Sequence, residues 1–262
     1  MFGTIILDAY KKDEVYSFSE KIEEICSPLD TVGWASAGIY SFWDYTSKEI
    51  LYIGLASDLY IRFKQHNGLL PIEHNACKYE QIQEYFEKHE KLGYSILVQS
   101  TLSQPIVHRN EKMYREFLSK PKGIPIENYA GEEGLENIRR VEGQLIEAYR
   151  MVVGDIPPWN KIGGDIRGRK AATVGNFVQI VKAFSEGNMN NHLVSKSSLR
   201  ELAESPTYEW FELQLHGLRM MMLNMGMSFD EAIKVQLQLN PYFEDNWNRI
   251  IEMKYLEKIL NV

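Results

Sequence analysis

Apolar and polar residues alternate along this chain with the periods of strands and of helices, and the clearest change of period lies in its first quarter. Two short runs rich in Ile, Tyr and Phe flank a polar turn, Gly38–Trp43 and Ile50–Leu55. They predict the two strands of a hairpin. Ser57 and Asp58 suit the N-cap and first turn of a following helix, because apolar residues recur directly behind them.

The same patterns predict further elements on both sides of the hairpin. Phe2–Leu7 predicts a short strand and Glu14–Cys26 a helix, which together would cover the core. Tyr94–Leu102 predicts the third strand of a small sheet. The segments before and after that strand predict helices, Lys78–Leu92 and His108–Lys120.

A long amphipathic helix is predicted over Leu135–Val153, where apolar residues recur at three- and four-residue steps. Glu142 lies beside this apolar stripe. Pro157 and Pro158 end the helix firmly, and Asn160 follows them.

Residues 171–262 carry helical signals only. Ser198–Glu201 and Ser228–Glu231 are capping boxes, and Pro206 and Pro241 suit first-turn helix positions. We therefore predict an all-helical domain. Its methionine-rich stretch indicates a core, with a surface for a partner protein as the alternative.

The charge of the chain limits its partners. The formal net charge of −7 argues against tight sequence-independent coating of DNA, which depends on many phosphate contacts. A nucleic-acid-binding protein of this charge needs a local basic patch. Lys161–Lys170 is the candidate, with four basic residues, three glycines and one acid. It is either a solvated linker between domains or a loop that contacts phosphates.

Two further features concern the compartment. Cys26 and Cys77 belong to no Cys/His cluster with zinc-site spacing, and two lone thiols fit a reducing cytoplasm. Charged residues come too early for a signal peptide, and no apolar run approaches the roughly 20 residues of a membrane helix. We expect a cytoplasmic protein with no membrane partner.

The hairpin, the helix behind it and the long helix carry one ordered set of motifs. Gly38-Ile39-Tyr40 and Tyr52-Ile53-Gly54 are separated by eleven residues, and Arg62 and His66 share a face of the next helix. Glu142, followed by Leu145-Ile146, and the ending Pro157-Pro158-Trp159-Asn160 complete the set. In this combination the chain resembles the GIY-YIG nuclease family, and most of all its restriction-endonuclease branch, over roughly residues 33–165.

The resemblance implies an active site for phosphodiester hydrolysis. Tyr40 would orient or deprotonate the attacking water, and Tyr52 would position a phosphate oxygen. Arg62 would bridge phosphate oxygens with its planar guanidinium. His66 would assist Tyr40 or the proton path, and Asn160 would hold the loops of the site by side-chain hydrogen bonds.

The resemblance also implies a metal ion. Glu142 would be the single protein ligand of Mg²⁺, with Mn²⁺ as the alternative ion. The interval from Glu142 to Asn160 exceeds that of compact members by about one helical turn, which leaves Glu147 as a competitor for the acidic role. DNA contacts are expected from basic residues near the site, namely Lys64, Lys161, Arg167, Arg169 and Lys170.

Together these features predict an α+β protein with a small GIY-YIG-type three-stranded antiparallel sheet, flanking helices and an appended all-helical C-terminal domain. The predicted segments are a cover element (1–32), a nuclease domain (33–170) and a helical accessory domain (171–262). The implied function is a Mg²⁺-dependent DNA endonuclease of restriction or phage defence. Alternatives are a repair, recombination or homing nuclease, and a catalytically idle DNA- or protein-binding module. A second copy or a partner protein would bind through the C-terminal domain.

Overall fold

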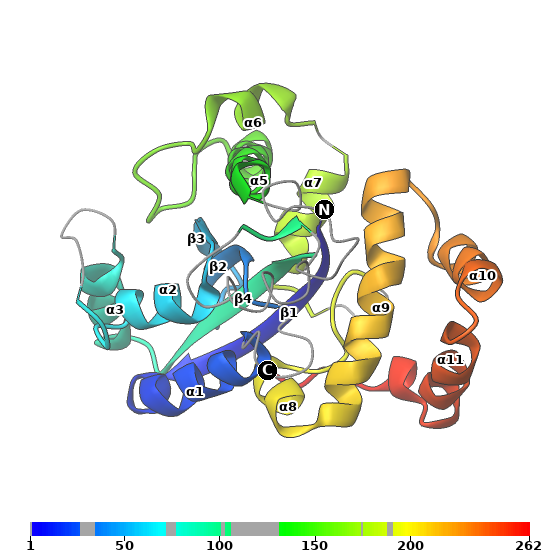
Figure 1. Cartoon of the computed structure of the whole chain (residues 1–262). Helices are drawn as coiled ribbons and strands as arrows, with labels where there is room; N and C mark the ends of the chain where they lie inside the picture. The colour runs from blue at the N-terminus through cyan, green and yellow to red at the C-terminus, as the bar shows by residue number, and fades with distance from the viewer. Residues whose placement is uncertain are drawn as a thin grey trace.

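The computed structural model describes residues 2–26, 35–71, 77–100, 103–105, 131–173, 175–187 and 191–262. The predicted helix at residues 108–120 lies outside these ranges. In the described part, a β-sheet forms the centre and helices cover both of its faces (Figure 1).

Four antiparallel strands form the sheet in the order β1-β4-β2-β3. Their bounds are Phe2–Lys11 for β1, Gly38–Asp44 for β2, Ile50–Ala56 for β3 and Lys91–Gln99 for β4. The predicted hairpin is confirmed as β2 and β3, and the later strand begins a few residues earlier than predicted. The prediction of three strands is wrong by one, because β1 joins the sheet beside β4.

β1 is buried on both faces, which explains why its role was not predicted. Ile5 and Leu7 belong to the core on one side of the sheet, while Ile6 and Tyr10 belong to the core on the other. A strand covered on both sides lacks the alternation of an exposed sheet face. Its pattern therefore indicated a short strand of a cover element instead of a full member of the sheet.

Four of the described helices pack on the first face of the sheet. They are α1 (Val15–Cys26), α2 (Leu59–His66), α3 (Tyr79–Phe86) and α8 (Leu199–Glu204). Phe18 of α1, Phe63 of α2 and Leu199 of α8 share one buried cluster with Tyr94 of β4. The predicted α1 is confirmed, whereas α3 is shorter than predicted because the chain enters β4 at Lys91.

The second face is covered by α5 (Gly131–Val153) and α7 (Asn176–Ala183), and the short α6 (Ile166–Ala171) packs on α5. Leu145 of α5 and Phe184, just beyond α7, share a second buried cluster with Ile39 and Trp43 of β2. Helices from both halves of the chain therefore bury the same sheet.

The chain ends in α9 (Pro206–Met225), α10 (Phe229–Leu239) and α11 (Phe243–Glu252), with short 3₁₀ helices at Lys12–Glu14 and Tyr255–Glu257. The helical character predicted for the C-terminal part is confirmed, and both capping boxes are present. α9 runs beside β1, while α10 and α11 lie on its outer side (Figure 1).

A buried polar cluster fixes α9 to β1. Arg219 forms an ion pair with Glu212, and its Nη1 donates to the hydroxyl of Thr4 at 3.0 Å. The backbone N–H of Thr4 in turn donates to Nδ1 of His216 at 3.1 Å. These directional contacts join the first strand to a helix more than two hundred residues later in the chain.

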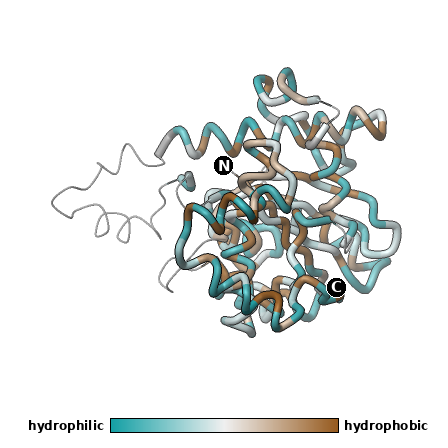
Figure 2. The backbone as a smooth tube through the Cα atoms, turned by 90° about the vertical axis from the view of Figure 1, so that its right-hand side faces the viewer, coloured by the Kyte–Doolittle hydropathy of each residue, from teal (hydrophilic) through white to brown (hydrophobic). Residues whose placement is uncertain are grey.

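Among the described helices, none combines the length and the apolar character that a membrane span requires. Hydrophobic and hydrophilic residues instead alternate along them (Figure 2).

Candidate functional site

The outer edge of β3 organises the candidate site. On an edge strand, alternate residues direct their backbone polar groups away from the sheet, and these groups need partners. The backbone N–H of Trp159 donates to the carbonyl of Leu51 at 2.8 Å. The side chain of Asn160 accepts from the N–H of Ile53 at 3.0 Å and donates to the same residue's carbonyl at 2.8 Å. Asn160 therefore holds the segment after α5 against β3, as a positioning residue.

Tyr40 and Tyr52 project from β2 and β3 towards α2, with ring centroids 5.8 Å apart. Gly54 is the cross-strand partner of Tyr40. A Cβ atom at position 54 would lie 2.7 Å from the Tyr40 hydroxyl and 2.5 Å from the Tyr52 ring. Gly54 is thus required at this position, because the two tyrosine side chains leave no room for a larger residue.

α2 brings Arg62 and His66 to Tyr40. The helix starts at Asp58, whose carboxylate accepts the N–H of Ile61 at 3.0 Å. One turn later, Nε of Arg62 donates to the Tyr40 hydroxyl at 3.2 Å, and Nε2 of His66 lies 2.6 Å from the same oxygen. The two residues predicted to share a helix face therefore meet at one atom.

The hydrogen bonds of His66 fix its tautomer. The ring is fully buried, and its Nδ1 accepts the backbone N–H of Lys78 at 2.9 Å. Burial, together with the cations of Arg62 and Lys78, lowers the pKa of His66 well below its usual range. A neutral ring whose Nδ1 accepts must carry its proton on Nε2. His66 therefore donates to the oxygen of Tyr40.

The oxygen of Tyr40 thus accepts two N–H groups, from Arg62 and His66. Both donors favour a phenolate, but the complete burial of the ring has the larger effect and raises the pKa of Tyr40 well above its usual value. The nearby Tyr52 raises that pKa further. In this state Tyr40 is a neutral phenol in a fixed orientation.

Glu142 reaches the site from α5, where this helix crosses the edge of β3. Burial raises the pKa of its carboxyl to about 7, although Arg62 and the backbone N–H of Leu55 oppose the shift. Asp165 of the following segment raises the pKa further. Glu142, Arg62 and Tyr52 line one open depression between α2 and β3.

Glu147, the competing carboxylate, lies elsewhere on α5. It accepts a hydrogen bond from Nε of Arg150 at 2.9 Å, and this pairing lowers its pKa. It does not line the depression beside Tyr52. Of the two acids, Glu142 is the one that the fold places with the tyrosines.

The donor set at Glu142 suits a hydrated cation. Within the described ranges, no three His, Cys, Asp or Glu side chains gather closely enough to enclose a metal ion. Mg²⁺ commonly keeps several waters and takes one or two carboxylates, so a single carboxylate beside an open depression fits it. A dication there would favour the ionised form of Glu142, which burial disfavours.

The predicted DNA contacts fall into separate groups. Nζ of Lys64 donates to the hydroxyl of Tyr60 at 2.8 Å and faces Glu20 and Glu23 of α1. Lys64 is therefore turned towards α1. Lys161, by contrast, is exposed and close enough to the buried Lys78 to lower the pKa of that lysine.

The other three predicted contacts, Arg167, Arg169 and Lys170, are exposed on α6. Arg167 pairs there with Glu136 of α5 and with Asp165. The basic side chains of α6 therefore form a solvent-facing group on the outer side of α5.

Glycines seat α6 on α5. A Cβ atom at Gly168 would lie 2.1 Å from the carbonyl oxygen of Arg140, and one at Gly143 would lie 2.4 Å from that of Asp165. Gly164 has a φ of 72°, which a residue with a side chain rarely adopts. The glycines of this segment thus allow two backbones to approach, which also brings Asp165 close to Glu142.

Lys78, at the N-terminal end of α3, was not predicted to belong to the site. Only 5% of this residue is exposed, and its ammonium lies 4.9 Å from the centroid of the Tyr52 ring. A lysine in a charged helical segment ordinarily has a solvated head group. Its spacing from His66 carried no signal, because the two residues are twelve positions apart and belong to different helical segments.

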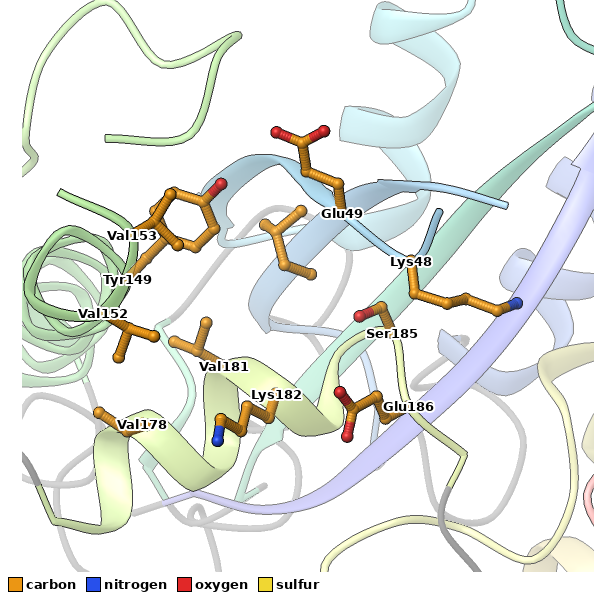
Figure 3. A pocket seen from close by; sticks show the side chains of 11 residues that line it. Lys48, Glu49, Tyr149, Val152, Val153, Val178, Val181, Lys182, Ser185 and Glu186 are labelled. Carbon is orange, nitrogen blue, oxygen red and sulfur yellow. The ribbon is translucent and has the colours of Figure 1, made fainter. Parts of the chain in front are cut away.

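A separate apolar pocket lies away from these residues. Tyr149 and Val152 of α5, Val178 and Val181 of α7 and the turn between β2 and β3 line a cavity of ≈ 330 Å³ (Figure 3). None of the predicted site residues borders it. It is a seam between two helices and the hairpin, and it holds no part of the candidate site.

Comparisons with protein-family models, with curated proteins and with solved structures find no match to this chain.

Proposed function

We propose that this protein is a metal-dependent endonuclease of the GIY-YIG type that hydrolyses DNA phosphodiester bonds. The observation that carries the proposal is the connected group that side chains of β2, β3 and α2 form with one side chain of the distant α5. Its members are Tyr40, Tyr52, Arg62, His66 and Glu142. These are the positions singled out by the sequence resemblance, and Glu142 joins the other four from a helix far along the chain.

Each group in the proposed site has a chemical task. Arg62 brings a positive charge to the depression and attracts phosphodiester oxygens. His66 and Arg62 hold the Tyr40 hydroxyl in one orientation, where it can position the attacking water. Glu142 would hold Mg²⁺, or Mn²⁺ in its place, and the bound ion would supply charge stabilisation to the reacting phosphate.

The exposed basic residues of α6 support DNA as the substrate. The chain is acidic overall, so DNA must approach where cations gather. Lys161 follows Asn160 directly, and Arg167, Arg169 and Lys170 come later on α6; all four are solvent-facing. Lys64, which faces α1, would contribute from the side of α2.

We favour restriction or phage defence as the biological setting, because Arg62 and His66 follow the pattern of the restriction branch. Repair, recombination and homing are the alternative settings of the same chemistry. One active site cuts one strand, so a double-strand break requires a second copy or a second event. The exposed apolar residues Leu239 and Tyr242 of the C-terminal helices are the candidate contact for that copy or for a partner protein.

Incubation of the purified protein with plasmid DNA and Mg²⁺ tests the proposal. Discrete fragments would indicate restriction, and a smear would indicate non-specific cutting. Arg62→Ala and Glu142→Gln should abolish cleavage, whereas Glu147→Gln should cleave like the wild type. Equal cleavage by all three variants would identify a contaminant. DNA binding without any cleavage in Mg²⁺ or Mn²⁺ would point to an idle binding module.

A further inference from the structure

Lys78 is a buried cation without an anionic neighbour in the described part of the chain. The titratable groups that act on its ammonium there are Lys161 and Arg62, both cations, and the neutral thiol of Cys77. Nζ has no hydrogen-bond acceptor among the described residues, and its contact is the face of the Tyr52 ring. A fold does not gain stability from such a placement.

The arrangement has an identifiable energetic cost. A cation removed from water loses its hydration, and two further cations nearby add repulsion. The interaction with an aromatic face offsets only part of this cost. Buried charges in this situation are typical of sites that complete their electrostatics with a ligand of opposite charge.

The position of Lys78 indicates which ligand this is. Its backbone N–H holds His66, and its side chain lies over Tyr52, which Arg62 also contacts. Tyr52 and Arg62 both line the open depression beside Glu142. Two cations, Arg62 and Lys78, therefore contact one tyrosine that lines this depression.

We propose that Lys78 is a phosphate-binding residue that forms, with Arg62, a two-cation seat for one phosphate group beside the Tyr52 hydroxyl. The identification of that phosphate as part of a nucleic-acid backbone rests on the proposed function. The seat itself rests on the burial of Lys78 and on its neighbours. Arg62 supplies a planar fork and Lys78 a compact charge, a combination that suits a tetrahedral anion.

The first test uses stability, which needs no enzymatic activity. Lys78→Met keeps the bulk over Tyr52 and removes the charge, so it should raise the melting temperature in chloride buffer. Lys258→Met is the matched control, because Lys258 also lies over a tyrosine but its ammonium pairs with Glu201 at 2.8 Å. The control variant should therefore melt at a lower temperature than the wild type.

The second test uses inorganic phosphate against chloride of equal ionic strength. Phosphate should stabilise the wild type, and Lys78→Met should bind it at least about tenfold more weakly, as expected when one charge-assisted hydrogen bond is lost. Lys78→Arg should recover most of the binding. An unchanged response to phosphate, or a melting temperature lowered as in Lys258→Met, would overturn the proposal.

Cleavage separates this inference from the proposed function. If the wild type cuts DNA, Lys78→Met should cut about a hundredfold more slowly, the loss typical of one transition-state contact. Cleavage at the wild-type rate by that variant would refute the seat and leave the nuclease proposal intact. Phosphate binding that depends on Lys78, in a wild type that cuts no DNA, would support the seat and refute the nuclease.

Discussion

Replacement of Glu142 by Gln should make the protein more stable at pH 8 while it removes the activity. Burial raises the pKa of this carboxyl from its ordinary 4.5 to about 7 in the folded state. Each pKa unit corresponds to about 1.36 kcal/mol, so the ionised carboxylate costs the fold at most about 3 kcal/mol. Gln keeps the size of the side chain and the acceptor for Leu55, but it carries no charge.

The sign of the effect follows from the two pKa values. Below about pH 4 the carboxyl is protonated in both the folded and the unfolded protein, so it adds no penalty. Between pH 4.5 and 7 the unfolded chain ionises first, and the wild type loses stability relative to Glu142→Gln. Above pH 7 the full penalty is present. The advantage of the variant should therefore be small at pH 4.5 and level off near pH 8.

Urea unfolding at pH 5 and pH 8, without divalent ions, measures this difference. Glu147→Gln is the matched control one turn away, because its carboxylate is paired with Arg150 and its pKa is lowered. That control should give no gain at pH 8. If Glu142→Gln also gave none, Glu142 would not be a desolvated acid and the reasoning on the site would fail.

Added Mg²⁺ gives the second half of the same test. With a pKa of about 7, Glu142 is roughly 90% ionised at pH 8 and roughly 10% ionised at pH 6. A cation that needs the carboxylate should bind about tenfold more weakly at pH 6. Titration calorimetry should show this loss for the wild type and no comparable binding for Glu142→Gln. Equal Mg²⁺ binding by both proteins would move the metal site elsewhere.

Four further outcomes can be checked with substitution variants or with the wild type. Arg167→Ala with Arg169→Ala should weaken DNA binding and reduce the slope of log affinity against log salt by about two, whereas an unchanged slope would make the segment a plain linker. Asn160→Asp should destabilise the fold by about 1–3 kcal/mol in urea unfolding, because a carboxylate would face the Ile53 carbonyl and could not donate to it. Stability equal to the wild type would show that Asn160 does not hold this segment against β3. His66→Gln, which retains an N–H donor, should keep most of the cleavage rate, whereas His66→Leu should lose about a hundredfold; equal losses would exclude a donor role. Fluorescence and circular dichroism should report one coincident unfolding transition, since α7 and α8 belong to the two cores of the sheet and α9 packs on β1. A protected fragment after proteolysis near residues 163–172 would instead support the predicted accessory domain.

The parts of the fold that were predictable are those with strong local signals. The hairpin follows from two β-rich runs around a turn, and α2 follows from the Asp58 cap. The capping boxes at Ser198 and Ser228 are likewise local, because each is closed within four residues. Such features need no knowledge of the rest of the chain.

The parts that were not predictable depend on contacts between distant residues. β1 joins the sheet because it pairs with β4 and packs against α9, and both elements lie far from it in the sequence. The burial of Lys78 involves contacts with Tyr52 and His66, which β3 and α2 supply. The segment that holds Gly164 and Gly168 was predicted to be either a linker or a phosphate-contacting loop, and both glycines meet the backbone of α5. In each case a contact with residues distant in the sequence decides the structure, and sequence periodicity does not reveal such contacts.

The direction of the hydrogen bonds at Tyr40 has consequences for any chemistry at this site. His66 can accept the tyrosine proton through Nε2 only if its Nδ1 becomes protonated, and the N–H of Lys78 already occupies Nδ1. His66 is therefore a positioning residue in this arrangement, and the Tyr40 proton must leave by another route. Arg62 and His66 already donate the N–H groups that would stabilise a phenolate. The burial of the Tyr40 ring is therefore what opposes loss of its proton. A cation bound beside Glu142 and Arg62 would lower the pKa of Tyr40 and so oppose the effect of burial. The acidity of Tyr40 therefore depends on whether the Glu142 carboxylate, across the depression, holds a cation.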